Sequence, residues 1–149
     1  MYVPDKLDIN IIKLLNINAR TSFREIAREL KVSLATIVKR IKRLESTGII
    51  KGYIPLVDLE LLNFDIQVVI GVKISHGKLI DVQKKLSKSN NVYQVYDVTG
   101  DWDSIIIAKV RNRAELNAFI KKMVATEFVE RTNTSVVLNV VKDEKRAQL

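Results

Sequence analysis

Apolar side chains recur at helical spacing in the first third of the chain and predict three short helices. The first helix spans residues 5–16, where Leu7, Ile11 and Leu14 share one face. The second helix begins after Ser22, because Glu25 follows three residues later, which is the spacing of a capping box. An apolar stripe continues this helix to about residue 30.

A tight turn at residues 31–32 separates the second predicted helix from the third. The third helix runs from Leu34 to about Thr47, with Ser33 as its cap and an apolar stripe spaced by four and then three residues. Gly48 is a suitable stop, since glycine tolerates a left-handed backbone. Three short helices with a tight turn before the third predict a helix-turn-helix of the three-helix or winged type.

The periodicity changes after an extended connector around Pro55. A short helical turn ended by Asn63 is expected first. Stretches rich in β-branched residues then predict four strands, at residues 66–74, 92–98, 102–110 and 128–141. Helical stripes predict two helices, at residues 78–87 and 113–126. The order β-α-β-β-α-β predicts a ferredoxin-like antiparallel sheet with two helices on one face.

These elements describe an α+β protein of two domains. A helix-turn-helix domain is expected at residues 1–53 and a ferredoxin-like domain at residues 65–142, with a linker at 54–64 and a polar tail at 143–149. The sheet face that carries no helix is apolar, because its strands are rich in Ile, Val and Tyr. We expect this face to mediate dimerisation.

Positive charge is concentrated in the first domain. The chain has a formal net charge of +8. Residues 1–53 carry eleven Lys or Arg against five Asp or Glu, a balance of +6, whereas residues 54–149 carry fourteen against twelve, a balance of +2. Residues 31–51 contain six Lys or Arg and a single acid, Glu45. This pattern favours a polyanionic partner, and a solvated helix face is the alternative interpretation.

If the apolar stripe of the third helix faces inward, its other side chains are free to meet double-stranded DNA. Small residues at its start can approach base edges in the major groove, and the cations behind them can reach phosphates or guanine edges. The predicted DNA-binding residues are Thr21, Ser22, Arg24, Ser33, Leu34, Ala35, Thr36, Lys39, Arg40 and Arg43. A three-helix unit used only for packing is the alternative.

Several classes of protein are disfavoured by what the sequence lacks. Without cysteine there is no disulfide framework, thiolate metal site or cysteine nucleophile. No run of about 18 apolar residues predicts a membrane span, and the first residues lack the apolar core of a signal peptide. His76 is the only histidine, in an expected loop. We therefore expect a cytoplasmic protein that has no catalytic residues, no metal and no cofactor and is not an enzyme.

The order of these motifs resembles the Lrp/AsnC family of feast/famine regulators. The runs LDINIIKLL, ARTSFREIAREL and VSLATIVKRIKRLESTGIIKGY resemble its N-terminal half, and VTGDWD and ERTNTSVVL resemble two motifs of its effector domain. The resemblance covers about residues 5–142. Leu34 stands where many members have proline, which could change how the third helix begins. Asn63 stands where many have glycine, and asparagine also tolerates a left-handed backbone.

The resemblance implies a DNA-binding regulator that dimerises through its second domain and assembles further into tetramers, octamers or hexadecamers. Such a dimer reaches successive major grooves of a pseudo-palindromic operator. A small effector, usually an amino acid, binds between dimers near the turn between the second and third strands. In this chain the implied effector-binding residues are Thr99, Gly100, Asp101, Trp102, Asp103, Thr132 and Thr134.

An amino acid is a zwitterion, so its site needs an acceptor for the ammonium group and donors for the carboxylate. Asp103 or Asp101 can supply the first, and backbone N–H groups around Gly100 can supply the second. Threonine hydroxyls on the facing segment add further partners. Aspartate is also common in turns that bind nothing, because it caps local N–H groups.

Three alternative functions remain open at this point. An architectural DNA-binding protein without an effector would have the same first domain. A tetrapyrrole decarboxylase of the same two-domain architecture would need histidine and arginine in its cavity. A sensor whose DNA-binding half has degenerated is disfavoured by the regular pattern of the third helix.

Overall fold

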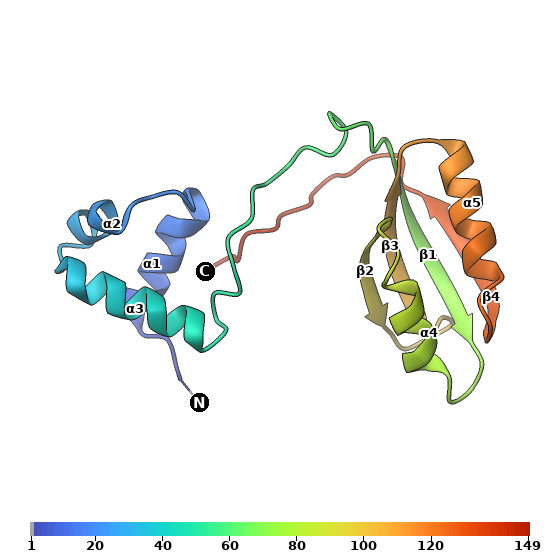
Figure 1. The fold of residues 1–149 in the computed structure, drawn as a ribbon, viewed down its shortest axis with the longest axis horizontal. Coiled ribbons are helices and arrows are strands. Elements are labelled where there is room, and N and C mark those ends of the chain that lie inside the picture. Colours follow the sequence, from blue (N-terminus) through green and yellow to red (C-terminus); the bar gives the residue numbers. More distant parts are fainter. Residues whose placement is uncertain (1) are drawn as a thin grey trace. The chain divides into compact units, whose positions relative to one another are not determined.

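The computed structural model describes residues 2–149, which form two compact units (Figure 1). Unit 1 contains residues 2–56 together with residues 143–149, and unit 2 contains residues 57–142. The C-terminal tail belongs to unit 1, where Asn16 Nδ2 donates a hydrogen bond to the Ala147 carbonyl over 3.0 Å. The domain limits inferred from the sequence, at residues 53 and 65, stay a prediction.

Unit 1 is built from three helices, each of which starts at a capping side chain. The helices are α1 (Lys6–Ile17), α2 (Phe23–Glu29) and α3 (Leu34–Ser46). The Asp5 carboxylate accepts the backbone N–H groups of Leu7 and Asp8, which caps α1. Ser22 and Ser33 cap α2 and α3 in the same way, as the sequence predicted. The capping box predicted between Ser22 and Glu25 is confirmed.

The core of unit 1 lies where the three apolar stripes meet. It is formed by Ile11 and Leu15 of α1, Ile26 and Ala27 of α2, and Ile37, Ile41 and Leu44 of α3. The turn before α3 uses a left-handed residue at Lys31 (φ 54°), and α3 stops before Gly48 (φ 73°). Among the described residues of unit 1 there is no strand, so the unit has the three-helix form without a wing.

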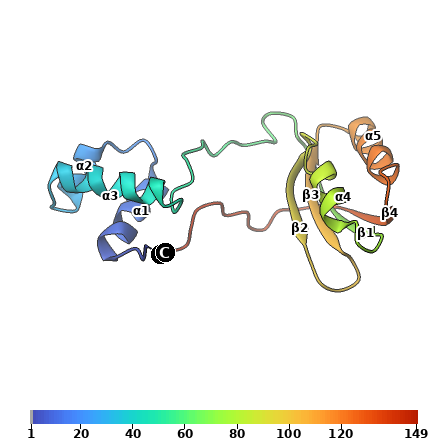
Figure 2. The ribbon, with the colours of Figure 1, turned by 60° about the horizontal axis from the view of Figure 1, so that its bottom comes forward.

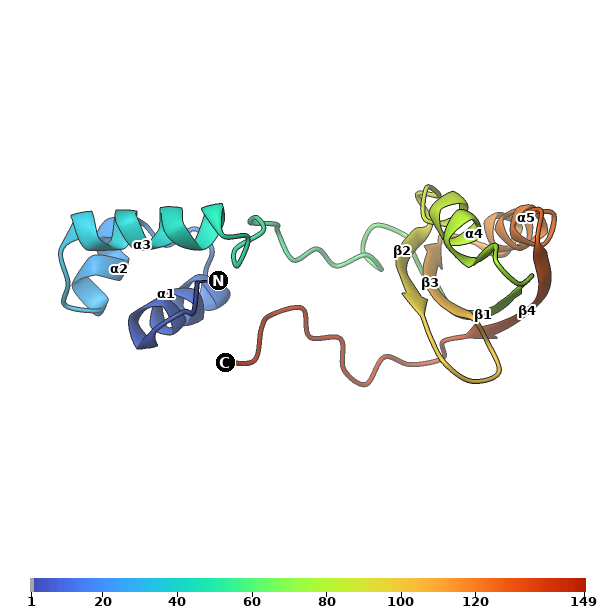
Figure 3. The same cartoon turned by 90° about the horizontal axis from the view of Figure 1, so that it is seen from below.

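Unit 2 has the predicted order β-α-β-β-α-β. Its elements are β1 (Ile66–Ile74), α4 (Leu79–Leu86), β2 (Val92–Asp97), β3 (Ser104–Val110), α5 (Arg113–Val124) and β4 (Val129–Val136). The strands form one antiparallel sheet in the order β2-β3-β1-β4. Both helices cover the same face of this sheet (Figures 2 and 3), which is the ferredoxin-like arrangement.

The alternation of side chains along each strand decides what the helices cover. Val68, Ile70 and Val72 of β1 are fully buried under α4 and α5. The same core contains two residues of β3, Ile106 and Ala108. The helices contribute Val82 of α4 and Phe119 and Met123 of α5. The core of unit 2 therefore lies between the sheet and its two helices.

The residues in between point to the other side of the sheet. We call this side the open face, and the strand register gives its residues as Gln67, Val69, Gly71, Lys73, Gln94, Tyr96, Ile105, Ile107, Lys109, Arg131, Asn133 and Ser135. Its centre is apolar because of Val69, Ile105 and Ile107, which are partly exposed. No helix of unit 2 covers this face (Figure 3).

Two strand limits differ by two residues or more from those predicted, and two others differ by one residue. The strand β4 ends at Val136 and not at residue 141. Its partner β1 begins at Ile66, so after a last hydrogen bond from Val137 N to Gln67 O there is no strand left to pair with. The strand β3 begins at Ser104, because residues 100–103 form the turn before it. Asn63 has the left-handed backbone (φ 62°) that its place in the turn suggested.

Candidate functional site

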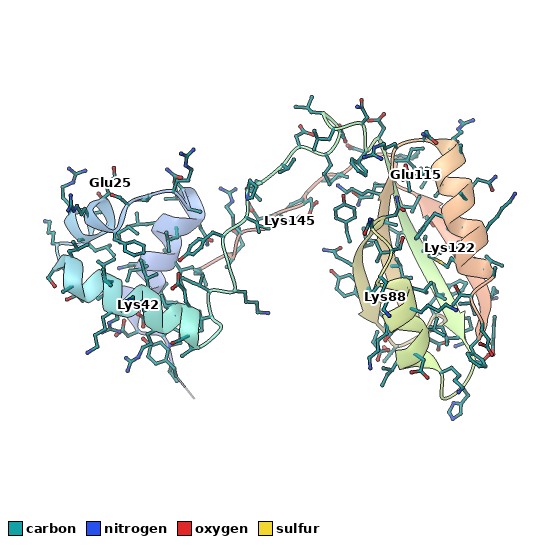
Figure 4. The ribbon with its side chains drawn as sticks, viewed as in Figure 1. Glu25, Lys42, Lys88, Glu115, Lys122 and Lys145 are labelled. Carbon is teal, nitrogen blue, oxygen red and sulfur yellow. The ribbon has the colours of Figure 1, made fainter. Side chains whose placement is uncertain are left out.

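The helix α3 presents a row of exposed side chains opposite its buried stripe. Ala35, Lys39, Lys42 and Arg43 lie on this outer side, and Lys42 is labelled in Figure 4. The surface is hollowed between Arg43, Lys39 and their neighbours Thr36 and Arg40. Leu34 is 41% exposed at the first position of the helix. Small and cationic residues of α3 thus share one accessible surface.

The hydroxyl groups predicted to contact DNA are used within unit 1. Ser33 Oγ accepts the backbone N–H of Thr36 over 3.1 Å and lies 2.8 Å from Thr36 Oγ1. Ser22 Oγ donates to Glu25 Oε2 over 2.8 Å, and Thr21 Oγ1 donates to the Asn18 carbonyl over 2.7 Å. Each hydroxyl oxygen retains lone pairs, but its local role is to fix a helix start or the turn before it.

Arg40 differs from the other cations of α3, because it is held by carboxylates of α1. Its Nη1 lies 2.6 Å from Asp5 Oδ2 and 3.3 Å from Asp8 Oδ2. The Asp8 side chain is fully buried, whereas that of Arg40 is 27% exposed. The backbone N–H of Asp8, together with the Arg40 guanidinium, lowers the pKa of the Asp5 carboxyl. Arg40 therefore ties α3 to the start of α1.

Two further acids of unit 1 also have partners. Glu25 is engaged in the cap of α2, where hydrogen bonds from Ser22 lower its pKa. Glu45 Oε1 accepts a hydrogen bond from the Tyr53 hydroxyl over 3.1 Å. Burial of that hydroxyl and its bond to Glu45 raise the pKa of Tyr53 to about 12. Lys39, Lys42 and Arg43 make no ion pair with any residue from 2 to 149, so their charge remains available to a polyanion.

The predicted effector residues of the β2–β3 turn are found at one end of the open face. Thr99, Gly100 and Asp101 are exposed, and Gly100 has a positive φ of 112°. Asp103, by contrast, turns its carboxylate back towards β1. Its Oδ1 accepts from Lys73 Nζ and its Oδ2 from the backbone N–H of Ile74, both over 2.8 Å. These two donors lower the pKa of Asp103, the lysine most.

Trp102 lies on the open face against β1. A Cβ placed on Gly71 would be 2.5 Å from Trp102 Cδ2, so only glycine leaves room for the indole. The guanidinium carbon of Arg131 is 4.6 Å from the centre of the indole ring. Gly71, Trp102 and Arg131 thus form a stack beside the ion pair of Lys73 and Asp103.

Thr132 and Thr134 are not brought together with this stack in the same subunit. The register pairs Thr132 with Val72 and Thr134 with Ile70, which are buried on the helix-covered face of the sheet. Arg131 and Asn133 hold the neighbouring positions of β4 on the open face. A role for the two threonines in effector binding stays a prediction, and a ligand on the open face would meet Arg131 and Asn133 first.

The predicted site residues did not include five residues of these two surfaces, although Lys42 was among the clustered cations and Arg131 in the segment that faces the turn. The exposure of Lys42 can be predicted from the helical spacing of α3 once its buried stripe is known. The other four, Tyr2, Gly71, Lys73 and Arg131, make their contacts with residues distant in sequence.

His76 lies exposed in the loop before α4. Within residues 2–149 no three His, Asp or Glu side chains are grouped as metal ligands. The same residues contain no helix long and apolar enough to cross a membrane.

Comparison with known proteins assigns both halves of the chain. Residues 5–45 match the family model of the AsnC-type helix-turn-helix domain, and residues 67–147 match that of the Lrp/AsnC ligand binding domain. HTH-type transcriptional regulators of Pyrococcus abyssi and Pyrococcus horikoshii are 42% and 41% identical to the chain over 144 residues. The matched region covers 97% of this chain and 98% and 97% of theirs.

Two solved structures share the fold along nearly the whole chain. E. coli AsnC superposes with a TM-score of 0.91 at 28% identity, covering 96% of this chain and 97% of its own. A transcriptional regulator from Neisseria meningitidis, solved as a complex with L-Met, gives a TM-score of 0.89 at 25% identity. That match covers 98% of this chain and 97% of the other.

Proposed function

Because the chain belongs to the Lrp/AsnC family of HTH-type transcriptional regulators, we propose that it binds DNA through α3 and responds to an amino acid through unit 2. The family is one of transcriptional regulators and not of enzymes, and its second domain is a ligand-binding domain. We therefore propose which residues of this chain contact DNA, which class of effector it binds and how it assembles.

The observation that supports the DNA-binding surface is the exposed cationic row on α3. In the proposal the first residues of α3, Leu34 to Thr36, approach base edges in the major groove. Lys39, Lys42 and Arg43 reach phosphates or guanine edges, and each neutralised phosphate releases a counterion. Further contacts, with the phosphate backbone of the DNA, are assigned to residues at the starts of α2 and α3: Thr21, Ser22, Arg24 and Ser33.

The β2–β3 turn is the proposed place of the effector. Asp101 is the better acceptor for an ammonium group, because both oxygens of Asp103 already have donors on β1. The backbone N–H groups around Gly100 are exposed donors for a carboxylate. A related regulator has been crystallised with L-Met, which supports an amino acid as the class of ligand.

Dimerisation through the open face completes the proposal. Val69, Ile105 and Ile107 give this face an apolar centre, which a second copy of the chain can bury. Two copies place their α3 helices in successive major grooves, about 34–36 Å apart, of a pseudo-palindromic operator. Further association of dimers into tetramers or octamers, and a cytoplasmic location, are part of the same proposal.

The proposal is tested by selecting DNA first and adding amino acids afterwards. A pool of random-sequence duplexes of about four helical turns is passed over the protein, and the bound fraction is sequenced. The affinity for the selected sequence is then measured with each of the twenty amino acids. A pseudo-palindromic sequence whose affinity changes with one of them supports the proposal. Sequence-independent binding that no amino acid changes would indicate an architectural DNA-binding protein instead.

A further inference from the structure

Tyr2, near the beginning of the chain, contacts two arginines of α3. Its hydroxyl donates a hydrogen bond to Asp8 Oδ2 and accepts one from Arg40 Nη1 over 3.3 Å. The centre of its ring lies 4.7 Å from the guanidinium carbon of Arg43. The side chain is only partly exposed and packs against the core of unit 1. Tyr2 thus links a buried carboxylate of α1 to two cations of the helix proposed to enter DNA.

The two arginines are held in different ways. Arg40 is neutralised by the carboxylates of Asp5 and Asp8, at 2.6 Å and 3.3 Å. Arg43 has no ion pair among the described residues, and its guanidinium lies over the Tyr2 ring. The charge of Arg40 is therefore used inside the protein, whereas the charge of Arg43 is exposed and uncompensated.

A guanidinium that lies over an aromatic ring keeps its donors. The ring attracts the cation through its π-face, and the five N–H groups point outward in the plane of the guanidinium. A phosphate can accept two of them without displacing the ring. Because a long side chain loses rotamer freedom when it binds, holding it in place beforehand reduces that loss.

We propose that Tyr2 is a positioning residue of the DNA-binding surface, whose ring holds Arg43 ready to bind a phosphate. Its hydroxyl, together with Asp5 and Asp8, keeps Arg40 on the protein as an anchor between α1 and α3. Arg40 is then a structural residue and not a DNA contact. This inference rests on the proposed function of α3 in DNA binding.

A double-mutant cycle tests the pairing of Tyr2 with Arg43. Tyr2→Ala, Arg43→Ala and the double variant are titrated against a fluorescent pool of random-sequence duplexes. Tyr2→Ala is expected to weaken binding about two- to ten-fold when Arg43 is present and to have little effect when it is absent. An equal loss in both backgrounds would overturn the role of Tyr2, because a general structural defect does not depend on Arg43.

Tyr2→Phe separates the ring from the hydroxyl. It keeps the surface under Arg43 and removes the hydrogen bonds to Asp8 and Arg40. We expect it to bind DNA like the unmodified protein while unfolding at a lower temperature. Binding as weak as that of Tyr2→Ala would contradict the role of the ring. A higher affinity in Tyr2→Ala would also contradict it, since Tyr2 would then compete with DNA for Arg43.

The salt dependence distinguishes this inference from the proposed function. Tyr2 is uncharged, so Tyr2→Ala should leave the slope of log affinity against log salt unchanged, whereas Arg43→Ala should reduce it by about one for each subunit in contact with DNA. An unchanged affinity and slope in Arg43→Ala would overturn the assignment of Arg43 to the DNA-binding surface and the role of Tyr2 with it. If Arg43→Ala weakens DNA binding and the effect of Tyr2→Ala is the same with and without Arg43, only the role of Tyr2 is overturned.

Discussion

The indole of Trp102 lies directly against Gly71 in the middle of β1, at a separation that leaves no room for a side chain on Gly71. Glycine is required there by this close approach, since the backbone of Gly71 is not among those with a positive φ. The contact fixes the β2–β3 turn, which carries Gly100 and Asp101, onto the open face of the sheet.

Gly71→Ala should therefore destabilise unit 2. The added methyl group must displace the indole, and overpacking of this kind costs about 1–3 kcal/mol. Trp102 is the only tryptophan of the chain, so its fluorescence reports the displacement and follows unfolding in urea. Combining Gly71→Ala with Trp102→Ala should remove most of the additional loss, and circular dichroism follows the unfolding of the variants that lack the tryptophan. If Gly71→Ala lowers stability as much in the Trp102→Ala background, the contact between residue 71 and the indole is not the cause of the loss.

Arg40→Ala is expected to destabilise unit 1 much more than Lys39→Ala. It leaves the fully buried Asp8 carboxylate without its cation, and a buried acceptor that loses a donor costs about 1–3 kcal/mol. Lys39 is exposed and has no ion pair among the described residues, so its removal should change stability by less than about 0.5 kcal/mol. The free energy of unfolding from urea titrations compares the two variants. Equal values would argue against the anchoring role of Arg40.

Two substitutions of Ser33 separate helix capping from DNA binding. Ser33→Ala removes the hydrogen bond to the Thr36 N–H and should cost about 1 kcal/mol of stability. Ser33→Asp keeps a good cap, and its negative charge suits a helix N-terminus. It should retain stability but weaken DNA binding, because the added charge would face phosphates. Thermal unfolding and duplex titration are measured on both variants, and undiminished DNA binding by Ser33→Asp would place this end of α3 away from DNA.

The pair of Asp103 and Lys73 should make the stability of unit 2 depend on pH. Donors from Lys73 and the Ile74 N–H lower the pKa of Asp103 in the folded chain below its ordinary value of 3.8. The stabilisation of the folded state by the Asp103 carboxylate is therefore complete at pH values above 3.8. It is lost as the pH falls through the lowered pKa of the folded chain. Asp103→Asn should consequently be less stable than the unmodified protein at neutral pH and approach it in acid. A stability difference independent of pH would contradict this.

The response to an amino acid distinguishes the two aspartates of the β2–β3 turn. Asp101→Asn should remove the ligand-dependent change in DNA affinity without lowering the stability of unit 2, because Asp101 is exposed. Asp103→Asn should lower stability and weaken the response only in part, since it loosens the turn. Ligand titrations followed by thermal shift measure both effects. A loss of response confined to Asp103→Asn would assign ligand contact to that residue.

Local signals in the sequence predicted most of the fold. The spacing of Ser22 and Glu25 located a helix start, and the β-branched run at residues 66–74 located both ends of β1, because helix caps and strand propensity depend on near neighbours. The candidate sites were harder to predict. The contacts of Tyr2 with Arg43, and of Trp102 with Gly71 and Arg131, join distant positions. The face of each β4 residue follows only from the register with β1.

The salt dependence of DNA binding shows whether the exposed cations of α3 contact phosphates. Duplex affinity is measured over a range of salt concentrations for the unmodified protein and for a variant with Lys39, Lys42 and Arg43 replaced by alanine. If these exposed cations of α3 bind phosphates, the variant should bind more weakly and its slope should fall by about three per subunit in contact with DNA. A variant that remains folded and keeps both the affinity and the slope would show that DNA is bound by another surface.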